Sequence, residues 1–309
     1  MPTLLYTHPA FLAHDPGPHH PERPERLRAI HAALEREAFQ ALERREAPRA
    51  GKAEIARVHG ARYIDWVLEQ IPKEGWAGLD ADTIVSPGSG EAALRAAGAV
   101  CAAVDAVVEG EATNAFCAVR PPGHHAEPEH AMGFCLFNNV AVGAAHARAV
   151  HGLQRVAVVD FDVHHGNGTQ AAFEADPDFF YASTHQWPLY PGTGQAHERG
   201  VANNIVNAPL APFSGSAEFR SAVERQVLPA LEAFKPALVL ISAGFDAHLR
   251  DPLASLNLVE EDYAWVTRKL CELAERHAKR RVVSSLEGGY DLRALANSVA
   301  AHVDALMAG

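Results

Sequence analysis

The stretch "VVDFDVHHGNG", residues 158–168, places two aspartates and two histidines directly after a run of strand-forming residues. Carboxylates and imidazoles crowded in this way are costly to desolvate unless an opposing charge compensates them. Alternate side chains of an extended segment point to the same side, so we expect Asp160, Asp162 and His164 to face one way. We interpret the stretch as a buried strand that presents oxygen and nitrogen ligands to a bound cation.

Similar apolar runs recur along the chain, at 115–120, 155–163, 179–184, 237–242 and 281–288. Short continuous runs of this kind are typical of strands that are buried on both faces of a parallel sheet. Between them lie stretches rich in alanine, leucine and charged residues that favour helix, at 89–109, 138–151, 216–233, 260–279 and 292–307. This alternation predicts an α/β fold with helices on both faces of the sheet. A serine just before the first turn of the helix at 89–109 predicts a capped start.

Length and charge limit the possible functions. The chain has 309 residues, of which 48% are hydrophobic, so it can bury a large core. It has no internal repeat and no low-complexity linker, and we therefore expect a single domain, 1–309. The formal net charge of −11 argues against nucleic acid as a partner, because binding phosphates requires a basic face.

The cysteines and the apolar segments bear on the cellular location. The four cysteines form no CxxC pair and lie in apolar contexts, at Cys101, Cys117, Cys135 and Cys271. Buried free thiols indicate a reducing compartment, so we expect a cytoplasmic protein. The first residues lack the features of a signal peptide, and no apolar run reaches the roughly 18 residues that a membrane span needs. We therefore expect no membrane partner. The oligomeric state stays open.

Acidic and imidazole side chains follow two of the predicted strands. Asp246 comes directly after "ALVLISAGF", as Asp162 and His164 come after the first strand. Two carboxylates and one imidazole that meet from two strands form a metal site with an open position for water. Each residue alone would more commonly be a helix cap or a core histidine, but their joint placement favours the metal site. Zinc or another first-row dication suits these ligands.

Two further strand ends carry groups suited to catalysis. His124 and His125 follow "AFCAVRPPG", and imidazoles transfer protons near neutral pH. In "SLEGGYDL", Gly288 and Gly289 allow a sharp turn that leaves room for a substrate, and Tyr290 can donate a hydrogen bond to an oxyanion.

Five ordered motifs resemble the histone deacetylase superfamily, which includes bacterial deacetylases, acetylpolyamine amidohydrolases and acetoin-utilisation proteins. They are "RPPGHHAEPEHAMGFCLFNN", "VVDFDVHHGNGTQ", "YPGTG", "SAGFDAH" and "EGGYDL". The resemblance extends from "HHPERPERL" at 19–27 to the last predicted strand, and "HHGNGTQ" and "FCLFNN" are most similar to the class II branch. It implies an arginase/deacetylase-like fold with a mostly parallel sheet of roughly eight strands. It also implies a zinc-dependent amidohydrolase that releases acetate from N-acetylated lysine side chains or similar amines.

The resemblance assigns roles to individual residues. The matching zinc ligands, for one ion per chain, are Asp162, His164 and Asp246. The matching catalytic residues are His124, His125, Tyr290, Asp160 and Asn167. Asn167 stands where class I members carry a second aspartate. Because an amide brings no charge, we expect His125 to be less basic than with an aspartate partner.

The resemblance also implies a tunnel for the substrate, lined by Gly133, Phe134, Tyr190, Leu253, Gly288 and Gly289. Tyr190 stands where relatives often carry phenylalanine. Leu253 falls where polyamine-specific members carry a glutamate, and its apolar side chain removes the main electrostatic attraction for polyamines. Either Asp80 or Asp82 could be the acid at the rim that holds the substrate backbone.

Potassium is a further implication of the resemblance. The residues that match an inner potassium site are Asp160, Asp162, His164, Ser183 and Thr184. An outer potassium would be bound by the backbone carbonyls of Phe173, Asp176 and Phe179. Ligands from the main chain leave little trace in a sequence, so both sites rest on the resemblance.

Three alternative functions stay open. An acetylpolyamine amidohydrolase performs the same chemistry on another amine. A catalytically silent protein would bind acyl-lysine without hydrolysing it, although every catalytic residue is present. An arginase-like hydrolase with two manganese ions would need a second set of ligands.

Overall fold

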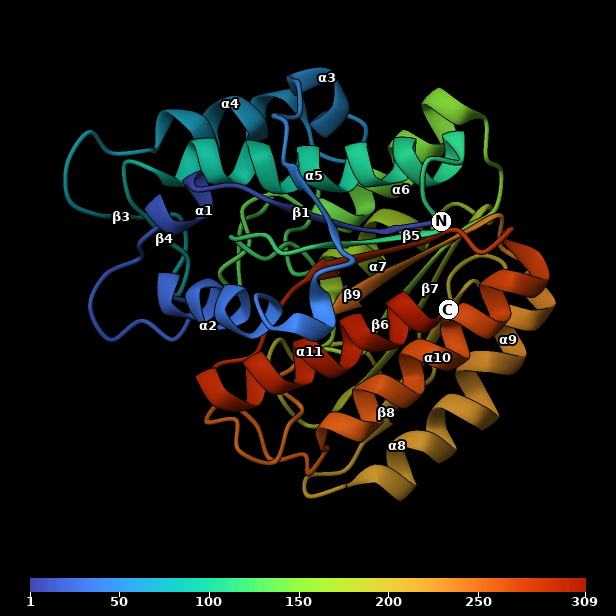
Figure 1. Ribbon diagram of the computed structural model, residues 1–309. Coiled ribbons are helices and arrows are strands. Elements are labelled where there is room, and N and C mark those ends of the chain that lie inside the picture. The colour runs from blue at the N-terminus through green and yellow to red at the C-terminus, as the bar shows by residue number, and fades with distance from the viewer.

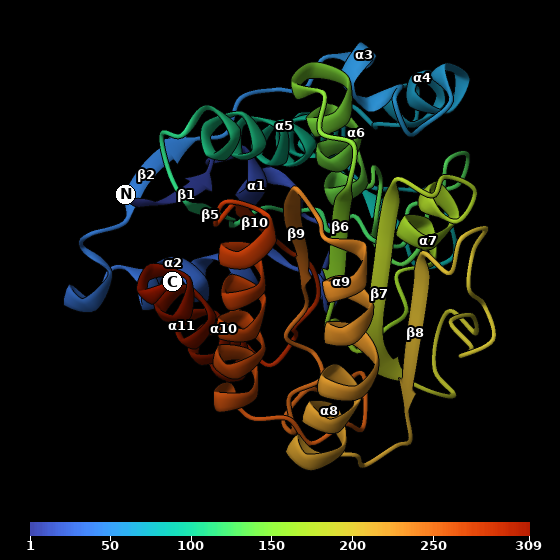
Figure 2. The same cartoon turned by 90° about the vertical axis from the view of Figure 1, so that its right-hand side faces the viewer.

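The centre of the computed structural model, which describes residues 1–309, is a sheet of eight strands in the order β2-β1-β5-β10-β9-β6-β7-β8 (Figures 1 and 2). All neighbouring strands in this sheet are parallel. The strands are β1 (Thr3–Thr7), β2 (Glu43–Glu46), β5 (Asn114–Cys117), β6 (Val156–Asp160), β7 (Phe179–Gln186), β8 (Ile205–Leu210), β9 (Leu238–Ala243) and β10 (Val282–Leu286). A separate antiparallel pair is formed by β3 (Ala77–Gly78) and β4 (Ile84–Val85).

Helices cover both faces of the sheet. In Figure 2, α5 and α6 lie over one face with α3 and α4 outside them, while α2, α11, α10, α9 and α8 cover the other. The helices are α1 (Ala10–Ala13), α2 (Pro24–Leu34), α3 (Lys52–Ile55), α4 (Ala61–Glu69), α5 (Ser89–Glu109), α6 (Asn139–His151), α7 (Asn167–Phe173), α8 (Ser216–Ala222), α9 (Leu228–Phe234), α10 (Glu260–His277) and α11 (Leu292–Ala308). A single 3₁₀ turn spans Glu37–Phe39. The predicted α/β fold is confirmed.

The central strands are buried because helices pack on both sides of them. Every residue of β6, β9 and β10 is buried, which explains why their sequences, VAVVD, LVLISA and VVSSL, are mostly apolar and do not alternate with exposed polar residues. Strand β2 was not predicted, because its sequence "ERRE" is charged and mostly exposed at the edge of the sheet. No helix combines the length and the apolar character that crossing a membrane requires.

Two helix predictions need correction. The helix at 89–109 has no serine cap: Gly88 is the N-cap, and the Ser89 hydroxyl instead accepts a hydrogen bond from the Ser86 N–H at 2.8 Å. The expected helix 216–233 is interrupted by a π-helical turn at Val223–Val227. Pro229 follows this turn and has no N–H to donate to the preceding turn, so the regular ladder cannot continue through it.

Candidate active site

Four neighbouring strands end at the same edge of the sheet. Strands β5, β10, β9 and β6 are adjacent and parallel, so the loops that follow them meet. Ligands of open α/β sheets bind beyond this edge. The loops carry the polar residues that the sequence analysis singled out: His124, His125, Asp162, His164, Asp246 and Tyr290.

Asp162, His164 and Asp246 converge on one point. His164 Nδ1 lies 3.1 Å from Asp162 Oδ1 and 3.1 Å from Asp246 Oδ2. The three ligand atoms lie within 4.8 Å of one another, and the two carboxylates are fully buried. Two buried carboxylates side by side are unfavourable without a compensating positive charge. Two oxygens and one nitrogen from the protein, with space left for a further ligand, therefore fit a catalytic zinc ion or a similar dication.

The second oxygen of each carboxylate is held by the backbone. Gly288 donates its N–H to Asp162 Oδ2 at 2.8 Å, and Val163 donates its N–H to Asp246 Oδ1 at 2.8 Å. The close approach requires glycine: a Cβ on Gly244 would lie 2.0 Å from Asp162 Oδ2, and one on Gly288 would lie 2.1 Å from Asp246 Oδ2. The remaining oxygens are thereby aimed at the shared point, as in metal sites whose ligands are oriented by outer hydrogen bonds.

The two adjacent histidines have different partners. His124 Nδ1 lies 2.9 Å from Asp160 Oδ2, so Asp160 bonds to this imidazole and does not join the three converging ligands. His125 Nδ1 lies 2.8 Å from Asn167 Oδ1, and Asn167 Nδ2 donates to Glu127 Oε1 at 2.8 Å. Because the amide oxygen can only accept, His125 carries its proton on Nδ1. Its Nε2 lone pair is left free to take a proton.

The surroundings of His124 and His125 give the two imidazoles different pKa values. Burial alone would lower the pKa of His124, but the Asp160 and Asp162 carboxylates raise it to about 10. Burial lowers the pKa of His125 well below its usual value, and positive charge on the adjacent His124 lowers it further. The hydrogen bond to Asn167 raises the pKa of His125, so the lower basicity expected from an amide in place of an aspartate stays a prediction.

A cavity of about 200 Å³ leads to these residues. Its lining includes His124, His125, His164 and Tyr290, and most of its surface is apolar. Gly133 has φ of +57°, and a Cβ at this position would lie 2.4 Å from the His125 ring. The remaining lining residues are Asp82, Pro122, Gly133, Phe134, Leu189, Tyr190, Leu253 and Gly288.

Comparisons with known proteins agree with this geometry. The family model described as "Histone deacetylase domain" matches residues 20–306. The chain belongs to the histone deacetylase family. It is 43% identical to the histone deacetylase-like amidohydrolase of Pseudomonas aeruginosa, over 88% of this chain and 72% of that protein. It is 41% identical to the polyamine deacetylase HDAC10 of Homo sapiens, over 93% of this chain but 44% of that protein. The crystal structure of the HDA15 HD domain matches with a TM-score of 0.94 and 36% identity, covering 99% of this chain and 88% of that one.

Membership in the family has two consequences. It confirms the predicted arginase/deacetylase fold, and it identifies the chain as a hydrolase that acts on amide bonds. Of the residues predicted to line the tunnel, five line the cavity: Gly133, Phe134, Tyr190, Leu253 and Gly288. Gly289 lies behind the wall, with φ of +122° and its would-be Cβ 2.8 Å from Leu295. It shapes the turn and does not line the cavity.

The structure separates the two candidate acids at the rim. Asp82 lines the cavity, and its Oδ1 accepts a hydrogen bond from the Gly133 N–H at 3.0 Å. Asp80 instead faces His130, with 3.3 Å between Asp80 Oδ2 and His130 Nε2. Of the two acids, only Asp82 therefore lines the cavity. It also holds the loop that bears Phe134, whose φ of +68° is unusual for an aromatic residue.

Sequence reasoning missed a buried charge network behind the deacetylase site. Glu22 accepts hydrogen bonds from Arg26 Nη1 at 2.9 Å and from Arg120 Nη2 at 2.7 Å, and none of the three is exposed. Arg26 continues to the turn of the site, donating to the carbonyls of Gly289 at 2.6 Å and Glu287 at 2.5 Å. The motif "HPERPER", which contains Glu22 and Arg26, was the available sign of this network. Charged residues are almost never fully buried unless they are paired with opposite charges.

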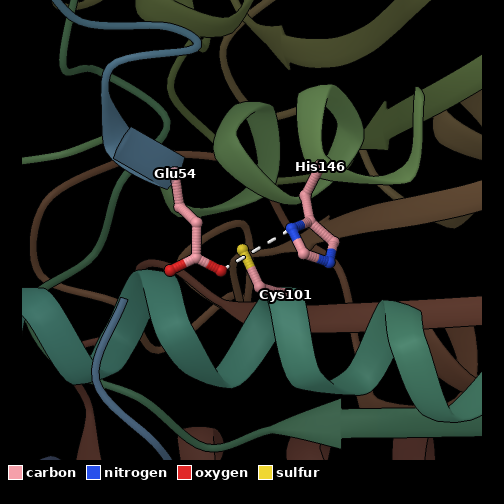
Figure 3. A group of neighbouring side chains, drawn as sticks. All are labelled: Glu54, Cys101 and His146. Carbon is pink, nitrogen blue, oxygen red and sulfur yellow. Dashed lines mark ion pairs between the residues drawn. The ribbon is translucent and has the colours of Figure 1, made fainter. Parts of the chain in front are cut away.

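A second group of potential ligands lies away from the cavity, between α3, α5 and α6 (Figure 3). It contains Glu54, Cys101 and His146. The His146 Nδ1 atom accepts a hydrogen bond from Arg57 Nη1 at 2.9 Å, so Nε2 carries the proton and donates to Asp105 Oδ1 at 2.6 Å. Burial also raises the pKa of the Cys101 thiol. The His146 ring is bonded on both nitrogens and joins neighbouring helices, so it has no lone pair left for a metal.

The residues that match the inner potassium site lie at and after the end of β6 and in the second half of β7, and those that match the outer site lie between the end of α7 and the start of β7. For the inner site, Asp160 pairs in register with Ser183 on the adjacent strands β6 and β7, so their main-chain atoms are neighbours. For the outer site, the carbonyls of Phe173, Asp176 and Phe179 all accept hydrogen bonds from one group, the side-chain amide of Asn204. A cation at the outer position would have to displace this amide.

Proposed function

We propose that this chain is a zinc-dependent deacetylase that hydrolyses N-acyl amides of lysine-type side chains, with residues 1–309 acting as one catalytic domain in the cytoplasm. The observation that carries the proposal is the convergence of Asp162, His164 and Asp246 beside a cavity that His164 lines. A histidine with a free lone pair and a buried tyrosine adjoin the same point. This set of groups can activate water and stabilise a developing oxyanion.

A dication held by Asp162, His164 and Asp246 would polarise the amide carbonyl and acidify water. His125 accepts the proton of the attacking water on Nε2, because its Nδ1 proton is engaged by Asn167. It then returns a proton to the departing amine nitrogen. His124, held by Asp160, supplies positive charge next to the reacting atoms.

Tyr290 stabilises the oxyanion by donating a hydrogen bond from its hydroxyl. Burial raises the pKa of Tyr290 well above its usual value, so the phenol keeps its proton at neutral pH. The Arg26 guanidinium lies over the ring, 4.9 Å from its centroid, and fixes the ring from behind. The Tyr290 hydroxyl can therefore donate a hydrogen bond at neutral pH, and the Arg26 side chain holds its ring in place.

The cavity supports an extended, largely apolar acyl-amine stem. Phe134, Leu189, Tyr190 and Leu253 line it, whereas charged groups are confined to the floor and to Asp82 at the rim. A lysine side chain has such a stem, with the amide at one end and a peptide backbone at the other. Contacts of this apolar kind discriminate weakly among acyl groups.

Metal content tests the proposal directly. We expect about one zinc ion per chain by elemental analysis, and we expect acetate release from a fluorogenic acetyl-lysine peptide to fall in step with the zinc that a chelator removes. Adding zinc should restore the rate. Two ions per chain would favour the dinuclear, arginase-like alternative. Peptide binding without acetate release by the zinc-loaded protein would identify a silent binding protein.

The polyamine alternative is favoured by the likeness to a polyamine deacetylase, and Leu253 provides its test. Leu253 lies on the cavity wall, so Leu253→Glu places a carboxylate where the second cationic amine of an acetylated polyamine would pass. We expect the ratio of kcat/KM for N-acetylputrescine to that for acetyl-lysine peptide to rise about tenfold. The matched control is Leu253→Gln, which has the shape of glutamate without its charge. An equal rise in both variants, or a wild type that already prefers acetylputrescine, would contradict the assignment to lysine-type substrates.

A further inference from the structure

We infer that the side-chain amide of Asn204 occupies the position of the outer alkali cation that the likeness to deacetylases implies, and that it replaces that cation. The inference concerns the frame around the site and holds independently of the proposed substrate. Asn204 directly precedes β8, a strand that the sequence did not predict.

Three carbonyl oxygens converge on one nitrogen atom. Asn204 Nδ2 lies 2.9 Å from the Phe173 oxygen, 3.0 Å from the Asp176 oxygen and 2.9 Å from the Phe179 oxygen. An amide has only two N–H groups, so three acceptors at these distances exceed its donors. Converging backbone carbonyls are the arrangement by which proteins replace the hydration shell of potassium. Here the partial positive charge of the NH₂ group lies at the point where those dipoles meet.

The amide is held in this orientation. Asn204 is 3% exposed, so solvent does not supply alternative partners. The Ala202 N–H points to Asn204 Oδ1 at 3.5 Å, which places the oxygen toward the turn and the NH₂ toward the carbonyls. Gly200 makes room for that oxygen, because a Cβ there would lie 2.3 Å from Asn204 Oδ1. The donor side of the amide therefore faces the carbonyls and the acceptor side faces the turn.

The bonded segments connect directly to the catalytic groups. Phe173 is the last residue of α7, whose first residue, Asn167, bonds to His125. Phe179 is the first residue of β7, and the two phenylalanine rings stack with centroids 4.7 Å apart. One amide thus joins the end of α7 to the starts of β7 and β8. A covalently attached donor performs this task at any potassium concentration.

Soaking crystals in thallium(I), a potassium substitute with strong anomalous scattering, tests the inference. In the wild type we expect no anomalous peak among the oxygens of Phe173, Asp176 and Phe179. In Asn204→Ala, which removes the amide, we expect a peak among them. A wild-type peak with the Asn204 side chain displaced would overturn the inference, and so would the absence of a peak in the variant.

Thermal unfolding gives a second readout that needs no crystal. In choline chloride, Asn204→Ala should lower Tm by roughly 2–6 °C, because three buried carbonyls lose their partner. When potassium chloride replaces choline chloride, the Tm of Asn204→Ala should rise by at least about half of this decrease, after the rise that potassium causes in the wild type is subtracted. The matched control is Asn114→Ala, which removes a buried amide bonded to a single carbonyl, that of Leu306, at 2.9 Å. Equal potassium responses in the two variants would overturn the inference.

Discussion

Tyr290→Phe should lower kcat for an acetyl-lysine peptide by about two to three orders of magnitude. A donor to a developing oxyanion is typically worth roughly 3–4 kcal/mol of barrier, and each 1.4 kcal/mol corresponds to about a factor of ten. The substitution removes only the hydroxyl. The phenyl ring keeps its place beneath Arg26, 4.9 Å from the guanidinium carbon, and its edge contact with Phe134, 6.0 Å between centroids. Steady-state kinetics under saturating substrate measure the effect.

Controls separate loss of the donor from loss of structure. Zinc content and Tm of Tyr290→Phe should equal those of the wild type, since the ligands Asp162, His164 and Asp246 are held by other contacts. KM should change far less than kcat, because the hydrogen bond strengthens in the transition state. A variant that retains near-full turnover would remove Tyr290 from the mechanism, and an unchanged kcat with a raised KM would reassign it to substrate binding.

The convergence of Asp162, His164 and Asp246 could be predicted from the order of strands and polar residues along the chain. Strand ends in a parallel sheet share one edge, so polar residues directly after "VAVVD" and "LVLISA" were expected at that edge, and the pairing of β6 with β9 brings them together. The same reasoning predicted that His124 and His125, which come after β5, lie at this edge of the sheet. Alternation alone predicted Asp160 on the same side as Asp162, whereas the resemblance grouped Asp160 with the catalytic residues, and its carboxylate contacts His124.

Other parts could not be predicted because their partners are distant in sequence or belong to the backbone. Glu22 and Arg120 are 98 residues apart, and no local pattern reveals their contact. The Asn204 amide binds carbonyls, which every residue possesses, so the sequence carries no sign of it. Residues 205–210 form a strand only because they pair with β7, and their own composition was not distinctive. Charged β2 was missed for the related reason that an exposed edge strand needs no apolar residues.

Glu22→Gln should lower the free energy of unfolding by about 3–5 kcal/mol, the range observed when one partner of a buried ion pair is removed. The carboxylate lies between two guanidinium groups, and His14 Nε2 is 3.2 Å away. Glutamine keeps the shape, but it removes the negative charge and turns one acceptor into a donor that faces other donors. Arg26 and Arg120 are then buried with too little opposing charge. Urea denaturation measures the loss.

The pH dependence of this loss identifies the charge as its cause. Burial alone would raise the pKa of Glu22, but Arg120, His14 and Arg26 hold it well below its usual value. A depressed pKa in the folded state contributes stability above the unfolded value of about 4.3, and this stability is lost as the pH falls through the folded value. The difference between wild type and Glu22→Gln should therefore be full at pH 7 and shrink steadily below about pH 4. Glu25→Gln is the matched control, because Glu25 forms an exposed pair with Arg28 and should cost less than about 1 kcal/mol. If the two glutamines cost the same, or if the loss in Glu22→Gln persists unchanged into acid, the buried carboxylate does not stabilise this region through its charge.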